Sequence, residues 1–234
     1  MKTLAAVMTD VRPSKPKQVG VRERQRSETQ RQVVDAAIAL FAQQGFDGTA
    51  LPAIAAASGV PVPLMIYHFK SKDQLWRTAV SEVFARVEAH LVQFQPQIER
   101  ATGGAFYWLC ARAHVSALAA YPEYMRIVFQ EGTQESERLT WLVETHQGKM
   151  TELLMAIIGR AQAEGLAPEM DLAHAKFIFS GAFALAIVLG PEYRLVTNTD
   201  SLSPAFIEQH IQTCLRLLLP SVDWNDPTNR PAVD

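Results

Sequence analysis

Residues 45–75 read GFDGTALPAIAAASGVPVPLMIYHFKSKDQL. Two compact turns divide this stretch, one at residues 45–48 before Thr49 and one at residues 58–60 before Pro61. They enclose a helix of about eight residues and set the next short helix across it, which is the arrangement of a helix-turn-helix. Such a unit presents its second helix to the major groove of DNA and leaves little room for an enzyme pocket. The spacing therefore predicts a small DNA-reading domain.

Helical periodicity continues on both sides of these turns. Apolar residues recur at the spacing of one helix face between residues 34 and 41, and again between residues 76 and 94. Ser27 and Ser71 each open a Ser-x-x-Gln capping box, so we expect the first and fourth helices to begin there. Periodicity alone is equally consistent with a helical bundle that has short loops and no DNA contact.

The residues of this stretch are more specific than its periodicity. The segment resembles the N-terminal domain of the TetR family of transcriptional regulators over roughly residues 27–80. The matching residues follow the family's order and spacing: Gly45, Phe46, Thr49, Ile54, Ala55, Gly59, Val60, Tyr67, His68, Phe69, Ser71 and Lys72. The resemblance implies an all-helical homodimer with a larger C-terminal domain that senses a ligand. It also implies binding to an operator that is released when a small molecule binds.

The chain departs from the family pattern in the recognition helix. Pro61 stands where the family usually has Ser, while Val62 and Pro63 stand where it often has Lys and Gly. Ile66 replaces a Tyr that commonly grips a phosphate. The exposed part of this helix therefore offers few hydrogen-bonding side chains. We expect base reading to rely on thymine methyl groups together with the aromatic residues that end the helix.

The N-terminal end of the chain is basic. Residues 1–31 hold eight Lys or Arg and three Asp or Glu, a net charge of +5, whereas the whole chain carries −2. This asymmetry is typical of an end that faces nucleic acid, and its Pro and Gly residues favour a flexible arm over residues 1–26. A solubilising tail is the alternative for residues 1–20. The residues expected to contact DNA are Arg26, Arg31, Thr49, Pro61, Val62, Pro63, Leu64, Tyr67, His68 and Lys72.

Composition limits the class of protein. At 234 residues the chain fits one domain or two, and 48% hydrophobic residues suffice for a substantial core. The N-terminus lacks a secretory apolar segment, and the apolar, uncharged run of 15 residues at 177–191 is too short to cross a bilayer. Cys110 and Cys214 are expected to pack in the core, with an oxidant-sensing pair as the alternative. We expect a cytoplasmic protein with no membrane, metal or cofactor.

The rest of the chain has helical spacing and no strand pattern. We expect helices near residues 102–120, 122–130, 135–163, 171–189 and 203–219, with Asp171 and Ser203 as N-caps. Together with the first four they make nine helices and an all-α fold. The expected domains are a basic arm (1–26), a helix-turn-helix domain (27–75), a ligand-binding and dimerisation domain (76–220) and a loose tail (221–234).

The helix over residues 171–189 is apolar nearly all round, so it must be covered on every side. Its small residues would let a partner helix approach closely. With the final helix it is expected to form a four-helix bundle between two subunits, and an internal helix of a monomer is the alternative. Two half-sites about 34–36 Å apart need two copies of a helix-turn-helix, which favours the homodimer.

An apolar pocket between the middle helices is a common design for binding a small molecule. The expected effector-binding residues are Trp108, His114, Met125, Phe129, Trp141, His146, Phe177 and Phe183. Each of them also fits a plain core position. His114, His146 and His174 lack the spacing of metal ligands on one helix face, so no metal site is expected.

Three classes of function can be compared. A ligand-responsive repressor that binds a palindromic operator of double-stranded DNA fits the sequence best. A helical small-molecule-binding protein of the same fold, with weak or lost operator binding, is the second class because of the atypical recognition helix. An enzyme is the third, because the sequence contains no G-x-S-x-G, H-E-x-x-H, Walker or Rossmann motif.

Overall fold

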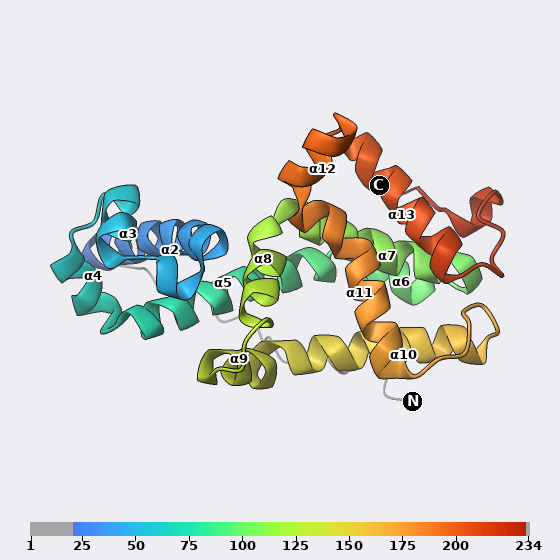
Figure 1. The fold of residues 1–234 in the computed structure, drawn as a ribbon, viewed down its shortest axis with the longest axis horizontal. Helices are drawn as coiled ribbons and strands as arrows, with labels where there is room; N and C mark the ends of the chain where they lie inside the picture. The colour runs from blue at the N-terminus through green and yellow to red at the C-terminus, as the bar shows by residue number, and fades with distance from the viewer. Residues whose placement is uncertain (1–20, 233–234) are drawn as a thin grey trace. The chain divides into compact units, whose positions relative to one another are not determined.

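The computed structural model describes residues 21–232, and every regular element in this range is helical (Figure 1). The described chain divides into two compact units. The first unit comprises residues 21–86 and 123–140, and the second comprises residues 87–122 and 141–232. The expected all-α class is therefore confirmed for the described residues.

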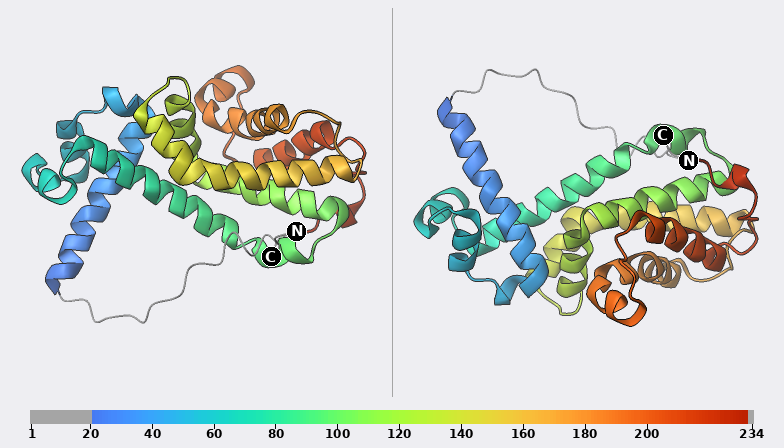
Figure 2. Two further views of the ribbon diagram at one scale, coloured as in Figure 1. Left: turned by 90° about the horizontal axis from the view of Figure 1, so that it is seen from below. Right: turned by 90° about the horizontal axis from the view of Figure 1, so that it is seen from above.

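Four helices make up the helix-turn-helix part of the first unit. They are α2 (Val21–Gly48), α3 (Leu51–Ser58), α4 (Val62–Phe69) and α5 (Lys72–Val92), the last of which passes into the second unit after residue 86. Their apolar faces close one core, in which Phe41, Ile54 and Trp76 are completely buried. α2 crosses α5 in both views of Figure 2. The directions of α3 and α4 differ by 104°, which lies within the range of a helix-turn-helix.

α2 begins earlier than its sequence indicates. The helix extends back to at least Val21, so Ser27 lies inside it and the expected capping box there is wrong. Residues 21–26, expected to be part of a flexible arm, are helical, while residues 1–20 lie outside the described residues. Within this part of α2 the hydroxyl of Thr29 donates to the carbonyl of Gln25 at 2.9 Å, a bond that Ser and Thr form in helix interiors.

Glycines and a serine set the turns of the first unit. Gly45 has φ 71° and Gly59 has φ 70°, a left-handed region that a residue with a Cβ atom enters only at a cost. The hydroxyl of Ser71 accepts the N–H of Gln74 at 3.0 Å, which confirms Ser71 as the N-cap of α5. These local contacts fix the direction in which α4 leaves α3 and α5 leaves α4.

A segment far along the chain completes the first unit. It contains most of α8 (Pro122–Glu131) and of α9 (Glu137–Leu142). Gln130 on α8 donates its side-chain amide to the carbonyl of Ala42 on α2 at 2.9 Å. The ring of Tyr124 meets that of Phe84 on α5, with centroids 4.7 Å apart. This segment therefore packs on the helix-turn-helix, although the sequence assigned it to the ligand-binding domain.

The second unit contains the remaining helices. They are α6 (Gln95–Arg100), α7 (Gly103–Ala120), α10 (Gly148–Ala163), α11 (Leu172–Val188), α12 (Gly190–Thr197) and α13 (Pro204–Leu218), with a π-helix η1 (Val143–Gln147) and a 3₁₀ turn η2 (Pro227–Asn229). α7 contacts α6, α11 and α13, and α11 contacts α10 (Figure 1). Asp171 and Ser203 accept the N–H groups of His174 and Phe206, so both predicted N-caps are confirmed.

Two short helices were not expected. If α9, η1 and α10 are taken as one continuous helix, residues 21–232 form eleven helices, and the additional ones are α6 and α12. Both carry Pro in their first turn, where the missing N–H has no partner to lose. Gly190 and Pro191, expected to end a helix, instead follow a bend of 71° and begin α12.

The C-terminal segment is packed rather than loose. Trp224 is buried against Trp108 of α7, with ring centroids 6.2 Å apart, and its indole N–H donates to the carbonyl of Leu219 at 3.1 Å. The Asn229 side chain lies directly against Gly104. The expected loose tail is therefore wrong for residues 221–232, because one large aromatic side chain anchors it.

No single helix among residues 21–232 has both the length and the apolar composition needed to cross a membrane. Two bent pairs, α3 with α4 and α11 with α12, reach the required composition only when the two helices of each pair are joined.

Candidate nucleic-acid interface

α4 is the second helix of the helix-turn-helix and has one inward and one outward side. Met65 and Phe69 lie in the core of the first unit. Pro61 precedes the helix and Pro63 lies in its first turn, where a fixed φ favours helix initiation. The outward residues were all predicted to contact DNA, and the structure places them at or near the surface: Pro61, Val62, Pro63, Leu64, Tyr67 and His68.

The outward side of α4 is mostly apolar. Leu64 is 41% and Tyr67 64% exposed. His68 is half-buried against the rings of its two neighbours, and its Nδ1 is buried without a hydrogen-bond partner among the described residues. The side therefore offers one phenol and one imidazole, and otherwise only hydrocarbon.

Two lysines follow α4. The Nζ of Lys70 donates to the carbonyl of Tyr67 at 2.8 Å and lies 5.3 Å from the centre of its ring. Lys70 has φ 68°, which is unusual for a residue with a side chain and places it as the C-cap of α4. Lys70 is not among the residues predicted from the sequence to contact DNA, although a cation directly after the recognition helix is a signal for phosphate contact.

Lys72, predicted as a DNA contact, stands at the first position of α5. Its Nζ lies 4.4 Å from the centre of the Phe46 ring, so a cation–π contact holds the ammonium group in place. The guanidinium of Arg138 lies 4.0 Å from the centre of the same ring. Phe46 thus joins the start of α5 to the segment that contains α8 and α9.

The two arginines predicted on α2 differ in their surroundings. Arg26 is exposed. Arg31 forms an ion pair with Glu28 at 2.7 Å, which raises the pKa of Arg31 and lowers that of Glu28. The neighbouring carboxylate offsets the charge of Arg31, so Arg26 is the freer of the two to meet a phosphate.

Thr49 is a core residue, and its predicted contact with DNA is wrong. The side chain is completely buried, and its hydroxyl lies 2.7 Å from the carbonyl oxygen of Gly45 and 3.2 Å from that of Leu40. The hydroxyl thus joins the turn before α3 to the last part of α2. Thr49, which matches the family pattern, therefore stabilises the turn between α2 and α3.

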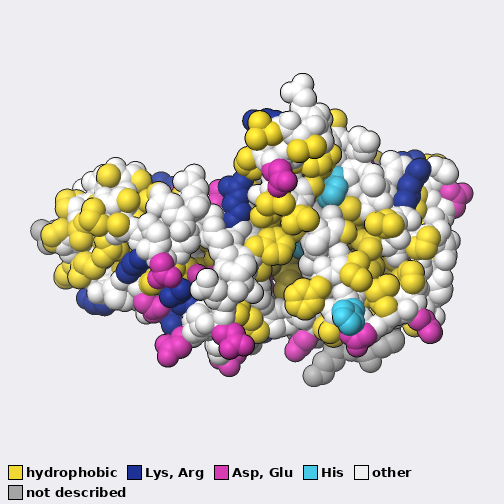
Figure 3. Space-filling view, viewed as in Figure 1, with side chains coloured by type: hydrophobic (Ala, Val, Ile, Leu, Met, Phe, Trp, Pro, Cys, Tyr) yellow, Lys and Arg dark blue, Asp and Glu magenta, His cyan; other side chains and the backbone are white. Residues whose placement is uncertain are grey.

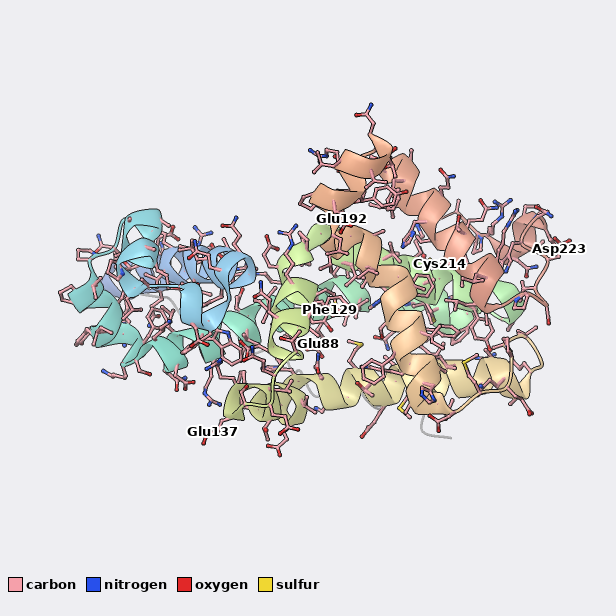
Figure 4. All side chains as sticks on the ribbon, in the orientation of Figure 1. Glu88, Phe129, Glu137, Glu192, Cys214 and Asp223 are labelled. Atoms are coloured by element: carbon pink, nitrogen blue, oxygen red, sulfur yellow. The ribbon has the colours of Figure 1, made fainter. Side chains whose placement is uncertain are left out.

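The eight predicted effector residues are divided between the two units. Met125 and Phe129 belong to α8 in the first unit, and Figure 4 labels Phe129 there. The others belong to the second unit. Within it, the ring of His114 meets that of Phe183 with centroids 6.4 Å apart, and the ring of Trp141 meets that of His146 with centroids 5.1 Å apart.

The two predicted polar residues of this set have low proton affinity. Burial lowers the pKa of His114 to about 4. Burial also lowers the pKa of His146, with Glu88 acting in the opposite direction. His114 is therefore a neutral imidazole at neutral pH, able to donate one hydrogen bond and accept another.

Two members of the predicted set lie elsewhere. Phe177 on α11 is 70% exposed, so the prediction that it lines a pocket is wrong for the single subunit described here. Trp108 packs against Trp224 and is a core residue. Because α11 is apolar on all sides, its sequence does not indicate which of its residues face inward.

Among residues 21–232 no group of three or more His, Cys, Asp or Glu is arranged to hold a metal ion. Both cysteines are free thiols, and burial raises the pKa of Cys110 to about 12 and that of Cys214 to about 11. Cys214, labelled in Figure 4, donates its thiol to the carbonyl of Ala182 on α11. Packing in the core, the expected role of the cysteines, agrees with these surroundings.

The fold and this surface define a DNA-binding protein of the helix-turn-helix class. Residues 33–79 match the family model of the bacterial regulatory proteins, tetR family. The transcriptional regulator RutR of Escherichia coli K12 is 24% identical over 88% of this chain and 96% of its own length. The regulator TcmR of Streptomyces glaucescens is 28% identical over 92% of this chain and 94% of its own length.

A solved structure has the same fold. FadR of Bacillus subtilis, determined in complex with stearoyl-CoA, superposes with a TM-score of 0.60 at 17% identity, over 82% of this chain and 99% of that chain. The helix-turn-helix of this chain matches that of the TetR family over residues 33–79, and the chain is similar over most of its length to helix-turn-helix transcriptional regulators. Its relatives are regulators and not enzymes.

Proposed function

We propose that this protein is a homodimeric repressor that leaves a palindromic operator when a small molecule binds to its larger unit. The observation that carries the proposal is the outward side of α4, which stands clear of the core and is followed by Lys70 and Lys72. A recognition helix bordered by cations suits the major groove and its phosphates. The proposed site of action is the cytoplasm, where the operator DNA is found.

The exposed apolar residues of the second unit support the homodimer. Phe177, Ile178 and Leu185 on α11 are at least half exposed, and Leu217 on α13 is 73% exposed. An apolar surface of this kind is unusual in a protein that remains a monomer. A second copy would cover it and would supply the second recognition helix that a palindromic operator needs.

The effector is proposed to bind in the second unit near His114. The neutral imidazole and the Phe183 ring beside it combine one polar group with an apolar wall, which is a common character of small-molecule sites. FadR, which shares the fold of this chain, was determined with an acyl-CoA, so a helical domain of this fold can hold a small molecule.

The effector can act only if it binds one arrangement of the recognition helices better than another. α5 is a candidate lever, because it starts beside α4 and continues into the second unit. Within the first unit Arg86 ties α5 to α2 through Asp35, and Arg138 contacts Phe46. Through these two contacts, a displacement of α5 would move the whole helix-turn-helix.

Fluorescence anisotropy with the DNA upstream of the protein's own gene tests the proposal. Specific binding that weakens when a co-purified small molecule is added would support it. A coupling of about 1–3 kcal/mol would change operator affinity roughly 5- to 150-fold, and operator must weaken effector binding by the same factor. Equal effector affinities with and without operator would contradict the proposed release.

The dimer has its own test. Leu217→Glu should yield monomers in sedimentation equilibrium and should lower operator affinity, because a charge would be buried between the subunits. Glu152→Gln on the exposed side of α10 serves as a control and should leave the dimer intact. A parent protein that sediments as a monomer at micromolar concentration would refute the dimer.

A second function is favoured by one observation. The first turn of α4 carries no side chain that can hydrogen-bond a base. A small-molecule-binding protein of this fold that has lost its operator would share this property. Absence of specific DNA binding, together with a retained small-molecule ligand, would select this alternative.

A further inference from the structure

The outer surface of α3 and α4 carries almost no hydrogen-bonding side chains. Between Ala50 and Ile66 only Ser58 has a nitrogen or oxygen atom in its side chain. Its hydroxyl is engaged inside the turn, where it accepts the N–H of Val60 at 3.3 Å and donates to the carbonyl of Ala55 at 3.5 Å. No side chain of this segment is therefore free to hydrogen-bond the edge of a base.

The part of α4 that faces outward is nevertheless well exposed. With Met65 and Phe69 in the core, Pro63, Leu64 and Tyr67 lie on the opposite side of the helix. Figure 3 shows hydrophobic side chains gathered over the end of the unit that α3 and α4 form. This apolar surface is the part of the unit that a ligand of α4 would meet first.

The charges beside this surface indicate its occupant. Lys70 is exposed directly after α4, and Lys72 follows at the start of α5. Cations beside hydrocarbon would also suit an acidic protein or an anionic lipid, but the helix-turn-helix arrangement of α3 and α4 suits the major groove of DNA. The major groove of DNA offers phosphates along its rim and base edges on its floor, so it matches both the cations and the apolar side.

The four bases differ in what they present to an apolar side chain. Guanine, adenine and cytosine are distinguished in the major groove by hydrogen bonds, whereas thymine carries a C5-methyl group. The N-terminal residues of a recognition helix are the ones that reach base edges. In this chain those residues are proline, valine and leucine.

Building on the proposed function, we propose that α4 recognises its operator through the methyl groups of thymine, which Pro63 and Leu64 contact. Each half-site then contains at least one thymine whose methyl group contributes to affinity. The two half-sites of a dimer repeat the contact, and the lysines hold the helix in register through the phosphates. Specificity in this scheme needs no bidentate hydrogen bond to a base.

Replacement of thymine by uracil tests the proposal, because uracil pairs with adenine in the same way but lacks the methyl group. Operators are first selected from random double-stranded DNA with the full-length protein. Each thymine of the selected site is then replaced in turn. Loss of a contacted methyl group should weaken binding about fourfold, as expected for one buried carbon, and about 16-fold when both half-sites are changed.

Matched variants assign the effect to α4. Leu64→Ala should remove the difference between thymine and uracil at the position that Leu64 contacts. The substitution is at an exposed site and favours helix, so the fold should be kept. Val92→Ala, at the end of α5 and 42% exposed, is the control and should retain the full uracil effect.

The outcomes separate this inference from the proposed function. If selection yields specific sites but every uracil operator binds like its parent, thymine reading is refuted and the operator function stands. If selection yields no site that binds more tightly than random DNA, the operator function itself is refuted, and this inference with it.

Discussion

Lys72→Ala should weaken DNA binding by an amount that depends on salt. The Nζ of Lys72 lies 4.4 Å from the centre of the Phe46 ring, so the ammonium group is already positioned before DNA arrives. It stands at the start of α5, where free helical N–H groups also favour an anion. We therefore expect each Lys72 to contact one backbone phosphate.

The size of the effect follows from the number of phosphates. Each contact contributes about −0.9 to the slope of log K against log salt concentration, and a dimer carries two copies of Lys72. The slope of the variant should thus be shallower by about 1.8. Between 50 and 200 mM salt, the affinity ratio of parent to variant should shrink about 12-fold, so the loss is largest at low salt.

Anisotropy titrations of a labelled operator at four salt concentrations measure these slopes. Lys149→Ala, which removes an exposed lysine from α10 in the second unit, is the matched control and should keep the parental slope. Phe46→Leu keeps the lysine but removes the ring that positions it. The salt slope of this variant should therefore lie between that of the parent and that of Lys72→Ala. Parallel lines for the parent and Lys72→Ala would refute the phosphate contact.

Three further predictions concern stability. Thr49→Val should lower the free energy of unfolding by about 1–3 kcal/mol because it removes the donor for buried carbonyls, whereas Thr78→Val, at an exposed helical hydroxyl, should change it by less than about 0.5 kcal/mol. Urea denaturation compares them, and equal small losses would contradict a core role for Thr49. Stability should also fall as the pH drops from 6.5 towards 4, because His114 has a pKa of about 4 when folded and 6.5 when unfolded, and the unfolded chain therefore takes up more protons. This contribution to the free energy of unfolding, about 3 kcal/mol, is complete above pH 6.5. His114→Gln should therefore flatten the profile of urea midpoint against pH. An unchanged profile would contradict the lowered pKa of His114. Gly104→Ala should loosen the C-terminal segment, because the new methyl group would overlap the side chain of Asn229, and limited proteolysis should then cut this segment sooner than in the parent.

The helix-turn-helix could be predicted from the sequence because its signals are local. A glycine at a left-handed turn or a serine at a helix start acts over three or four residues. Gly45, Gly59 and Ser71 therefore have the roles that their sequence positions indicate. Periodicity was less decisive in α4, where the apolar Leu64, Met65 and Phe69 all suit a core face but only Met65 and Phe69 are buried.

Other parts of the site depended on contacts between distant segments. Thr49 matched a family pattern, but only the closeness of two backbone carbonyls shows that its hydroxyl is used inside the fold. Phe177 lies on a helix that is apolar all round, so periodicity gave no inward direction. Trp224 follows a proline in a polar segment, and its burial depends on Trp108, which is 116 residues earlier.

The sequence by itself determined the class of fold, the position of the recognition helix and its unusual apolar chemistry. These properties belong to short segments, whose conformation depends on neighbours in the chain. The tertiary structure alone decided that residues 123–140 pack on the helix-turn-helix, where Arg138 and Lys72 meet at the Phe46 ring. Such a contact depends on the paths of several helices together, and no local pattern of residues encodes it.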